Sequence, residues 1–195
     1  MTDVSKRDPT QAQRAPLVER KDDLYETPAV AVHALLRVET LPPRLWEPAA
    51  GRCAIVNILR GHGHEVLASD LVVYGDTTHL PRRDFLLEHK APDGCQAIIT
   101  NPPYKLADQF VRHALGLVPR VVMLLRLAFL ESERRADLIE RSGLARVHVF
   151  GRRLPMMHRD QWTGPKANSG MAFAWFCWDR AHTGPTELHR LSWRD

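Results

Sequence analysis

The sequence predicts an α/β fold built on a doubly wound, mostly parallel sheet. Three observations carry this prediction: short apolar runs, helical segments between them, and an acidic Gly/Ala turn after the first run. Strands are expected near 44–47, 65–69, 97–100, 121–126, 146–150 and 171–178. Helices are expected at 52–61, 105–117 and 131–142. Strands that alternate with helices favour parallel pairing, so the carboxyl ends of these strands should share one edge of the sheet.

The chain is expected to form one folded domain over residues 22–179. It has 195 residues, of which 44% are hydrophobic and 26% charged, a composition that suits one sizeable core. Residues 1–21 are polar and proline-containing and are expected to be disordered, and 180–195 are expected to form a C-terminal tail. The first helix should begin with Thr27 as its cap and Pro28 at its first position.

Composition also narrows the class of protein. No apolar stretch approaches the ~20 residues of a membrane helix, and the start lacks a signal core, so we expect a cytoplasmic protein without membrane contact. The three cysteines, Cys53, Cys95 and Cys177, show no paired spacing, so neither a disulfide framework nor a metal site is expected. A net charge of +4 mildly favours a polyanionic partner.

The turn after the first strand has the character of a cofactor loop. Glu47, Pro48, Ala49 and Gly51 lie between a strand and a helix, where small residues let a ligand approach the backbone and the helix adds N–H donors. Asp70 ends the second strand at the distance expected of a ribose-binding carboxylate in a Rossmann-like unit. Its other reading is a residue that closes a turn.

The most informative motif is Asn101-Pro102-Pro103-Tyr104, directly after the strand at 97–100. The Asn101 side-chain carbonyl and the Pro102 backbone carbonyl can accept hydrogen bonds from one exocyclic amine, and the prolines fix φ. Tyr104 offers a face on which a planar ring can stack. A plain proline turn is the structural alternative.

Together these motifs resemble the class I S-adenosylmethionine-dependent methyltransferases, and most nearly the small phage and prophage-type DNA N6-adenine methyltransferases. The resemblance covers roughly Tyr25 to Trp178. It implies a Rossmann-like, seven-stranded sheet whose last two strands form an antiparallel hairpin. It also implies S-adenosylmethionine as the cofactor and a catalytic role for residues 101–104, which match the family pattern of Asn or Asp, Pro, Pro and an aromatic residue.

The resemblance also implies a cofactor site. Thr27 and Pro28 match a motif that touches the methionine end of the cofactor, and Asp84 with Phe85 match the acid and ring at its adenine. The family usually has a second glycine two positions after Gly51, where this chain has Cys53. The implied cofactor-binding residues are Tyr25, Thr27, Pro28, Glu47, Pro48, Ala49, Gly51, Asp70, Leu71, Asp84, Phe85 and Asn101.

A basic stretch between the last two strands is the candidate substrate loop. Basic residues mixed with aromatic ones suit a loop that grips phosphates near an extruded base, although a solvated loop would have a similar composition. Arg126, at the end of the strand at 121–126, either lines the substrate mouth or pairs with an acid. The candidate substrate-binding residues are Arg126, Arg152, Arg153, His158, Arg159, Trp162 and Lys166.

Three functions stay open. The leading one is methyl transfer to the exocyclic amine of adenine in DNA. The second is the same transfer to adenine in RNA, or to a glutamine amide in protein, which presents a similar NH2 group. The third is a noncatalytic protein that binds cofactor or nucleic acid. Because no separate recognition domain is expected, sequence specificity should be loose, read by residues 151–170, or supplied by a partner subunit.

Overall fold

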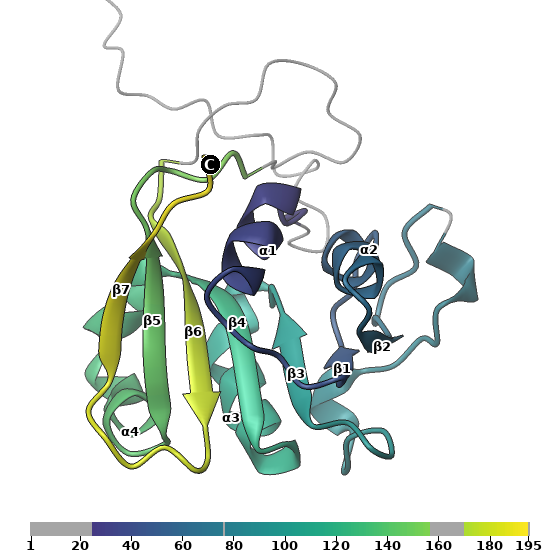
Figure 1. Cartoon of the computed structure of the whole chain (residues 1–195). Coiled ribbons are helices and arrows are strands. Elements are labelled where there is room, and N and C mark those ends of the chain that lie inside the picture. Colours follow the sequence, from purple (N-terminus) through teal and green to yellow (C-terminus); the bar gives the residue numbers. More distant parts are fainter. Residues whose placement is uncertain (1–24, 76, 157–169, 195) are drawn as a thin grey trace, which may run out of the picture.

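The computed structural model describes residues 25–75, 77–156 and 170–194, and these form one α/β unit (Figure 1). Seven strands make a single sheet in the order β2-β1-β3-β4-β6-β5-β7. The strands are β1 Arg44–Glu47, β2 Glu65–Ala68, β3 Ala97–Thr100, β4 Arg120–Arg126, β5 Leu144–Phe150, β6 Phe173–Asp179 and β7 Glu187–Leu191. The helices are α1 Ala29–Leu36, α2 Ala54–Gly61, α3 Ala107–Leu117 and α4 Ala136–Glu140.

Strand pairing creates the geometry of a ligand site. All neighbours are parallel except β6, which runs antiparallel to both β4 and β5, so the expected antiparallel pair is confirmed. Strand β1, next to the edge strand β2, pairs with β2 on one side and with β3 on the other. The strand order therefore reverses between β1 and β3, and open α/β sheets bind ligands outside the carboxyl ends at such a point.

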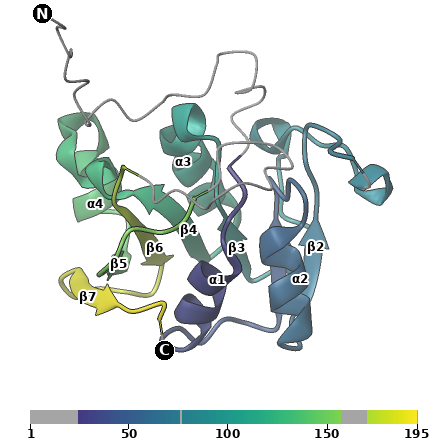
Figure 2. The same cartoon turned by 90° about the horizontal axis from the view of Figure 1, so that it is seen from above.

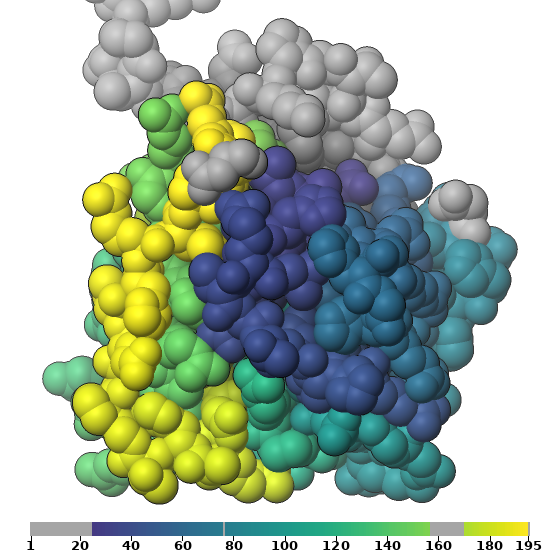
Figure 3. Space-filling model, in the orientation of Figure 1, coloured from purple at the N-terminus to yellow at the C-terminus, as the bar shows by residue number. Residues whose placement is uncertain are grey.

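Helices cover both faces of the sheet. Figures 1 and 2 show α1 and α2 on one face and α3 and α4 on the other. In Figure 3, α1 and α2 lie side by side over the first face. Neighbouring strand residues point to opposite faces: Ile99 packs with the α1/α2 core and Ile98 with the α3 core. Among the helices of the described ranges, none is long and apolar enough to span a bilayer.

Two buried tryptophans of β6 tie the helices to the sheet. The Trp175 indole N–H donates to the carbonyl of Ala31 in α1 at 2.9 Å. The Trp178 indole N–H donates to the carbonyl of Leu138 in α4 at 2.8 Å. Each indole thus buries its ring and satisfies its donor, which orients one helix on each face.

Two expected helices differ from those in the structure. Helix α1 begins at Ala29 with Pro28 as its N-cap, and no side chain caps it, so the expected Thr27 cap is wrong. The expected helix at 131–142 is broken into 3₁₀ turns and the short α4, because Ser132 has an extended backbone and Arg135 is held by the carbonyl of Phe129 at 2.8 Å.

Residues 180–195 contribute a strand rather than only a tail. Strand β7 pairs in parallel with β5 over five residues and covers the edge of the sheet. Four of its five side chains are exposed, and only Leu191 is buried. An edge strand of this kind lacks the apolar run by which strands are predicted, but its backbone satisfies groups that β5 would otherwise leave unpaired.

A buried ion cluster joins the chain after α1 to β5. The Glu39 carboxylate accepts hydrogen bonds from His148 Nε2 at 2.7 Å and from Arg146 Nη2 at 2.9 Å. Its side chain is only 2% exposed. Burial alone would raise the pKa of Glu39, but the hydrogen bonds from His148 and Arg146 outweigh burial and lower this pKa to about 2.

Replacing Glu39 with alanine should lower the free energy of unfolding by about 3 kcal/mol at pH 7, because His148 and Arg146 lose a buried acceptor. Since the folded pKa is depressed, this stabilisation is complete above the unfolded value of 4.5 and is lost as pH falls toward about 2. Urea unfolding at pH 7 and pH 3 measures both effects. The exposed Glu140→Ala is the control, and equal unfolding free energies for the two variants at pH 7 would contradict this role for Glu39.

Candidate active site

A cavity of about 380 Å³ opens at the carboxyl edge of β1, β2 and β3. Glu47 ends β1, Asp70 follows β2 and Asn101 follows β3, so the topology brings three separate motifs to one place. The segment before α1 supplies the fourth side. The lining comprises Tyr25, Glu26, Thr27, Glu47, Ala49, Ala50, Gly51, Arg52, Ala54, Ile55, Asp70, Leu71, Val72, Tyr74, Asn101, Pro103, Lys105 and Leu106.

Glu47 is the most unusual group in this cavity. The residue is 1% exposed, and neither carboxylate oxygen forms a hydrogen bond of normal geometry with a described residue. Burial raises the pKa of Glu47 well above its usual range, because it outweighs the nearby Thr100 hydroxyl and Ala49 N–H, which lower this pKa, while the charge of Asp70 raises it further. A buried carboxyl without a partner costs free energy, and that cost falls when a ligand brings a cation or an N–H donor.

Asp70 holds the Gly51 turn against the end of β2. Its Oδ2 accepts the Gly51 N–H at 2.7 Å, and its Oδ1 accepts the Val72 N–H at 2.9 Å. Gly51 has φ of 52°, a left-handed conformation that favours glycine. The turn-closing reading of Asp70 is therefore confirmed. Because each carboxylate oxygen can accept more than one hydrogen bond, Asp70 can also receive donors from the cavity that it lines.

Cys53 occupies a backbone conformation that glycine adopts without strain. Its φ is 64°, and it is the one non-glycine residue of the described ranges with positive φ. A left-handed conformation costs a residue with a Cβ about 1–2 kcal/mol. The side chain packs in the core beneath α2 and does not line the cavity. Cys53 in place of a glycine therefore strains the backbone, but its side chain does not narrow the cavity.

Asn101 combines one satisfied donor with one unsatisfied acceptor. Its Nδ2 donates to the backbone carbonyl of Tyr25 at 2.7 Å. Because that carbonyl can only accept, the amide orientation is determined. The Oδ1 atom is buried and has no hydrogen-bond partner among the described residues. Pro103 lines the cavity beside Asn101, whereas Pro102 is buried and lies outside the lining. The side chain thus presents an oriented acceptor to a ligand that carries an N–H group.

The ring of Tyr104 already has neighbours on its faces. Tyr25 stacks on it with ring centroids 4.3 Å apart, and the guanidinium carbon of Arg126 lies 4.2 Å from the Tyr104 centroid. Phe173 at the start of β6 approaches the same ring at 5.7 Å. Arg126 therefore lies beside Tyr104, but it is not among the residues that line the cavity. A planar substrate would have to displace Tyr25 or Arg126 to stack on Tyr104.

The structure does not bring Asp84 and Phe85 to the cavity. The Asp84 side chain accepts the Leu86 N–H at 3.0 Å and caps a 3₁₀ turn. Phe85 is 2% exposed and packs against Trp46 and Phe110 in the core. A large aromatic ring gains more from burial in this core than from an exposed position, and the sequence pattern alone does not show which it takes. Pro28 and Pro48 also lie outside the lining.

The cavity includes residues that the sequence reading missed. Val72 and Tyr74 line it together with the expected Leu71, and all three lie within four residues after Asp70. Arg52 and Lys105 add positive charge to the lining. The sequence signal for these residues was the apolar run that follows Asp70, the candidate ribose-binding carboxylate. A chain that leaves β2 at this edge must pass the mouth of the site.

The expected substrate loop is described only in part. Arg152 and Arg153 are exposed and follow β5 at the same edge of the sheet as the cavity. The remaining loop candidates, His158, Arg159, Trp162 and Lys166, lie outside the described residues.

Comparison with known proteins identifies the fold. No protein-family model matches the sequence, and no curated protein gives a significant match. A proposed RNA methyltransferase from Pyrococcus horikoshii is similar at a TM-score of 0.56 and 16% identity, over 84% of this chain and 89% of that one. A proposed class I S-adenosylmethionine-dependent methyltransferase from Listeria monocytogenes is similar at 0.57 and 14%, over 85% and 64%.

A third similar structure is the 23S rRNA methyltransferase ErmE, at a TM-score of 0.55 and 14% identity, over 79% of this chain and 68% of that one. At these identities the likeness defines the fold alone. The chain therefore has the α/β fold of the class I S-adenosylmethionine-dependent methyltransferases, as its motifs predicted.

Proposed function

We propose that this protein is an S-adenosylmethionine-dependent methyltransferase that modifies the exocyclic amine of adenine in DNA. The observation that carries this proposal is the oriented, buried and unpartnered Oδ1 of Asn101 at the carboxyl end of β3. An acceptor of this kind suits an amine whose hydrogens must be held while its lone pair is aimed. The same cavity contains groups of the charge and position that the cofactor requires.

The residues of the cavity fit S-adenosylmethionine. The ligand carries an ammonium and a sulfonium, and within the described part of the chain no cationic side chain pairs with the buried Glu47 carboxylate. Asp70 would accept the ribose hydroxyls, and Leu71 with Tyr74 would flank the adenine in place of Asp84 and Phe85. The volume of about 380 Å³ falls within the range of small-molecule sites.

The chain's own residues then position the substrate amine. When bound, S-adenosylmethionine supplies a methyl group that is already activated on a sulfonium. Asn101 Oδ1 accepts a hydrogen bond from the amine, which draws the nitrogen out of conjugation with its ring and aims the lone pair. The Pro102 carbonyl is the second proposed acceptor. No strong base is required, because the nitrogen becomes acidic only as it gains the methyl group, and its proton can leave late to water or a carbonyl.

The target base must leave its stack to reach Asn101. We infer that the extruded adenine stacks on Tyr104 in exchange for Tyr25 or Arg126, whose guanidinium would move toward the substrate backbone. Exposed Arg152 and Arg153 at the same edge would attract the phosphates. The two exposed arginines support a nucleic acid rather than a protein glutamine as the substrate.

Methylation of adenine in RNA is the second candidate. Two of the similar structures are named as RNA methyltransferases, one of them acting on 23S rRNA. The Asn101 site would hold the amine of adenine in the same way in either nucleic acid, so the choice depends on contacts outside the cavity.

Transfer of a labelled methyl group to double-stranded DNA, single-stranded DNA, RNA and bulk protein in parallel tests the proposal. We expect label to appear as N6-methyladenine in DNA and to disappear in Asn101→Ala. Label in RNA alone would select the second candidate. Absence of label from every pool, together with cofactor binding in a titration, would instead indicate a noncatalytic binding protein.

A further inference from the structure

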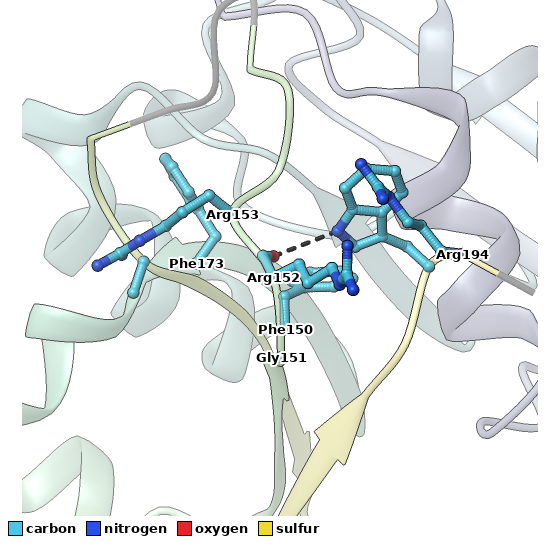
Figure 4. A pocket seen from close by; sticks show the side chains of 8 residues that line it. Phe150, Gly151, Arg152, Arg153, Phe173 and Arg194 are labelled. Atoms are coloured by element: carbon cyan, nitrogen blue, oxygen red, sulfur yellow. Dashed lines mark hydrogen bonds between the residues drawn. The ribbon is translucent and has the colours of Figure 1, made fainter.

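A second pocket lies at the same edge of the sheet, about 550 Å³ in volume, where β5 and β7 end and β6 begins. Figure 4 shows Arg153 and Phe173 on one side of it and Arg194 on the other. Its lining contains three arginines and two large aromatic rings beside Phe150, but no acid among the described residues. The lining residues are Phe150, Gly151, Arg152, Arg153, Ala172, Phe173, Trp193 and Arg194.

Hydrogen bonds hold the two walls of this pocket together. The Trp193 indole N–H donates to the Arg152 carbonyl at 3.2 Å, as Figure 4 shows. The Gly151 N–H donates to the Leu191 carbonyl at 3.0 Å. The Arg194 guanidinium lies 5.2 Å from the Trp193 ring centroid. The segment after β7 is therefore attached to the end of β5, and the pocket is part of the fold.

The charge of the pocket is unbalanced. Arg152, Arg153 and Arg194 form no ion pair with a described residue, and no carboxylate of the described lining faces them. Like charges held close together repel one another, and a bound phosphate would neutralise them with charge-assisted hydrogen bonds. The rings of Trp193 and Phe173 supply apolar surface beside these cations. Guanidinium groups next to aromatic faces match a nucleotide, which has a phosphate and a stacking base.

One side chain connects this pocket to the active-site cavity. Phe173 lines the pocket, and its ring centroid lies 5.7 Å from that of Tyr104. Tyr104 belongs to the same tetrapeptide as Asn101. A strand whose adenine reaches Asn101 would therefore pass over Phe173 and arrive at the three arginines within a short distance.

We propose that this pocket binds an unstacked nucleotide of the substrate strand, next to the target adenine. Arg152, Arg153 and Arg194 would hold its phosphates, and Trp193 would contact its base. This inference rests on the proposed function for the identity of the substrate, but binding at the pocket does not require methyl transfer. It assigns a role in substrate recognition to the segment after β7, which contains no part of the methyltransferase motifs.

The test measures binding of a fluorescein-labelled, adenine-containing 12-nucleotide single-stranded DNA to the full chain by anisotropy, without cofactor. The variant Arg152→Ala/Arg194→Ala should bind at least about tenfold more weakly. The slope of the logarithm of the binding constant against the logarithm of the salt concentration should become shallower by about 0.7 for each phosphate contact that is lost. The matched control, Arg134→Ala/Arg141→Ala, removes the same charge from exposed positions near α4 and should change affinity less than twofold.

A second pair of variants tests the base contact. Trp193→Leu should weaken binding several-fold, whereas Trp193→Phe should retain most of it, with thermal unfolding recorded to confirm that both fold. Equal affinities for the pocket double variant and its control would overturn the proposal, as would equal affinities for the Leu and Phe variants. RNA of the same sequence shows whether the pocket discriminates between the two nucleic acids.

The outcome is independent of methyl transfer. If the wild type transfers no methyl group but the pocket variants lose DNA binding relative to their control, the pocket stands and the proposed function fails. If transfer occurs and the pocket variants raise the KM for DNA without changing cofactor affinity, both stand. If transfer occurs and the pocket variants match the control in DNA affinity and KM, only the pocket proposal fails.

Discussion

Asn101→Ala is expected to lower methyl transfer to adenine at least about 10²–10³-fold, the usual cost of removing one positioned hydrogen-bonding group from an active site. The variant loses the buried Oδ1 that has no partner among the described residues, and with it the acceptor that aims the amine. Affinity for S-adenosylmethionine should change little, because the variant keeps Glu47 at the carboxyl end of β1 and Asp70 just after β2. Single-turnover transfer and a cofactor titration separate the two quantities.

Two further variants sharpen this prediction. Asn101→Asp keeps an oxygen in place but replaces the Nδ2 donor that binds the Tyr25 carbonyl at 2.7 Å, so it should retain part of the activity. Asn57→Ala removes an exposed asparagine from α2 and should behave as the wild type. Full turnover by Asn101→Ala would contradict the assignment of residues 101–104 as the catalytic motif.

Glu47→Gln is expected to weaken S-adenosylmethionine binding by about 2–3 kcal/mol or more, the usual cost of losing one partner of a buried charge pair. Without cofactor the same variant should be more stable than the wild type at high pH, where Glu47 must ionise in a buried site and glutamine cannot. Isothermal titration and urea unfolding measure the two effects, with the exposed Glu131→Gln as the control.

The pH dependence of this variant follows from the direction of the shift. Burial raises the pKa of Glu47 above the unfolded value of 4.5, so its contribution to stability is complete below 4.5 and is lost as pH rises through the folded pKa. The stability advantage of Glu47→Gln should therefore grow with pH. Cofactor affinity of the wild type should rise over the same interval, since a cation favours the carboxylate, while that of the variant stays flat. A wild-type affinity that is independent of pH would argue against Glu47 as the cation-binding group.

The sheet edge that carries the site was predictable because its signals are local. Apolar residues 97–100 followed by two prolines specify a buried strand and the place where it ends. The small residues up to Gly51 specify a tight turn, and Asp70 ends the next apolar run. Parallel pairing then places all three motifs at one edge without further information.

Other features depend on contacts that no local pattern reveals. Glu39 meets Arg146 and His148, residues 107 and 109 positions away, and nothing near Glu39 in the sequence distinguishes it from a surface carboxylate. Strand β7 is mostly exposed and has no apolar run. Phe85 follows Asp84 in a pattern that suits a ligand site, but its ring packs between Trp46 and Phe110 in the core.

The sequence by itself therefore determined the fold class, the ends of β1, β2 and β3, and the side chains that those ends present, because strand period and turn chemistry act over a few neighbouring residues. Only the tertiary structure decided that Asn101 Oδ1 and the Glu47 carboxylate are buried without a hydrogen bond of normal geometry in the described structure, and that the segment after β7 completes an arginine pocket beside Tyr104. Burial and partnership are properties of the packed chain, since each depends on residues far apart in the sequence.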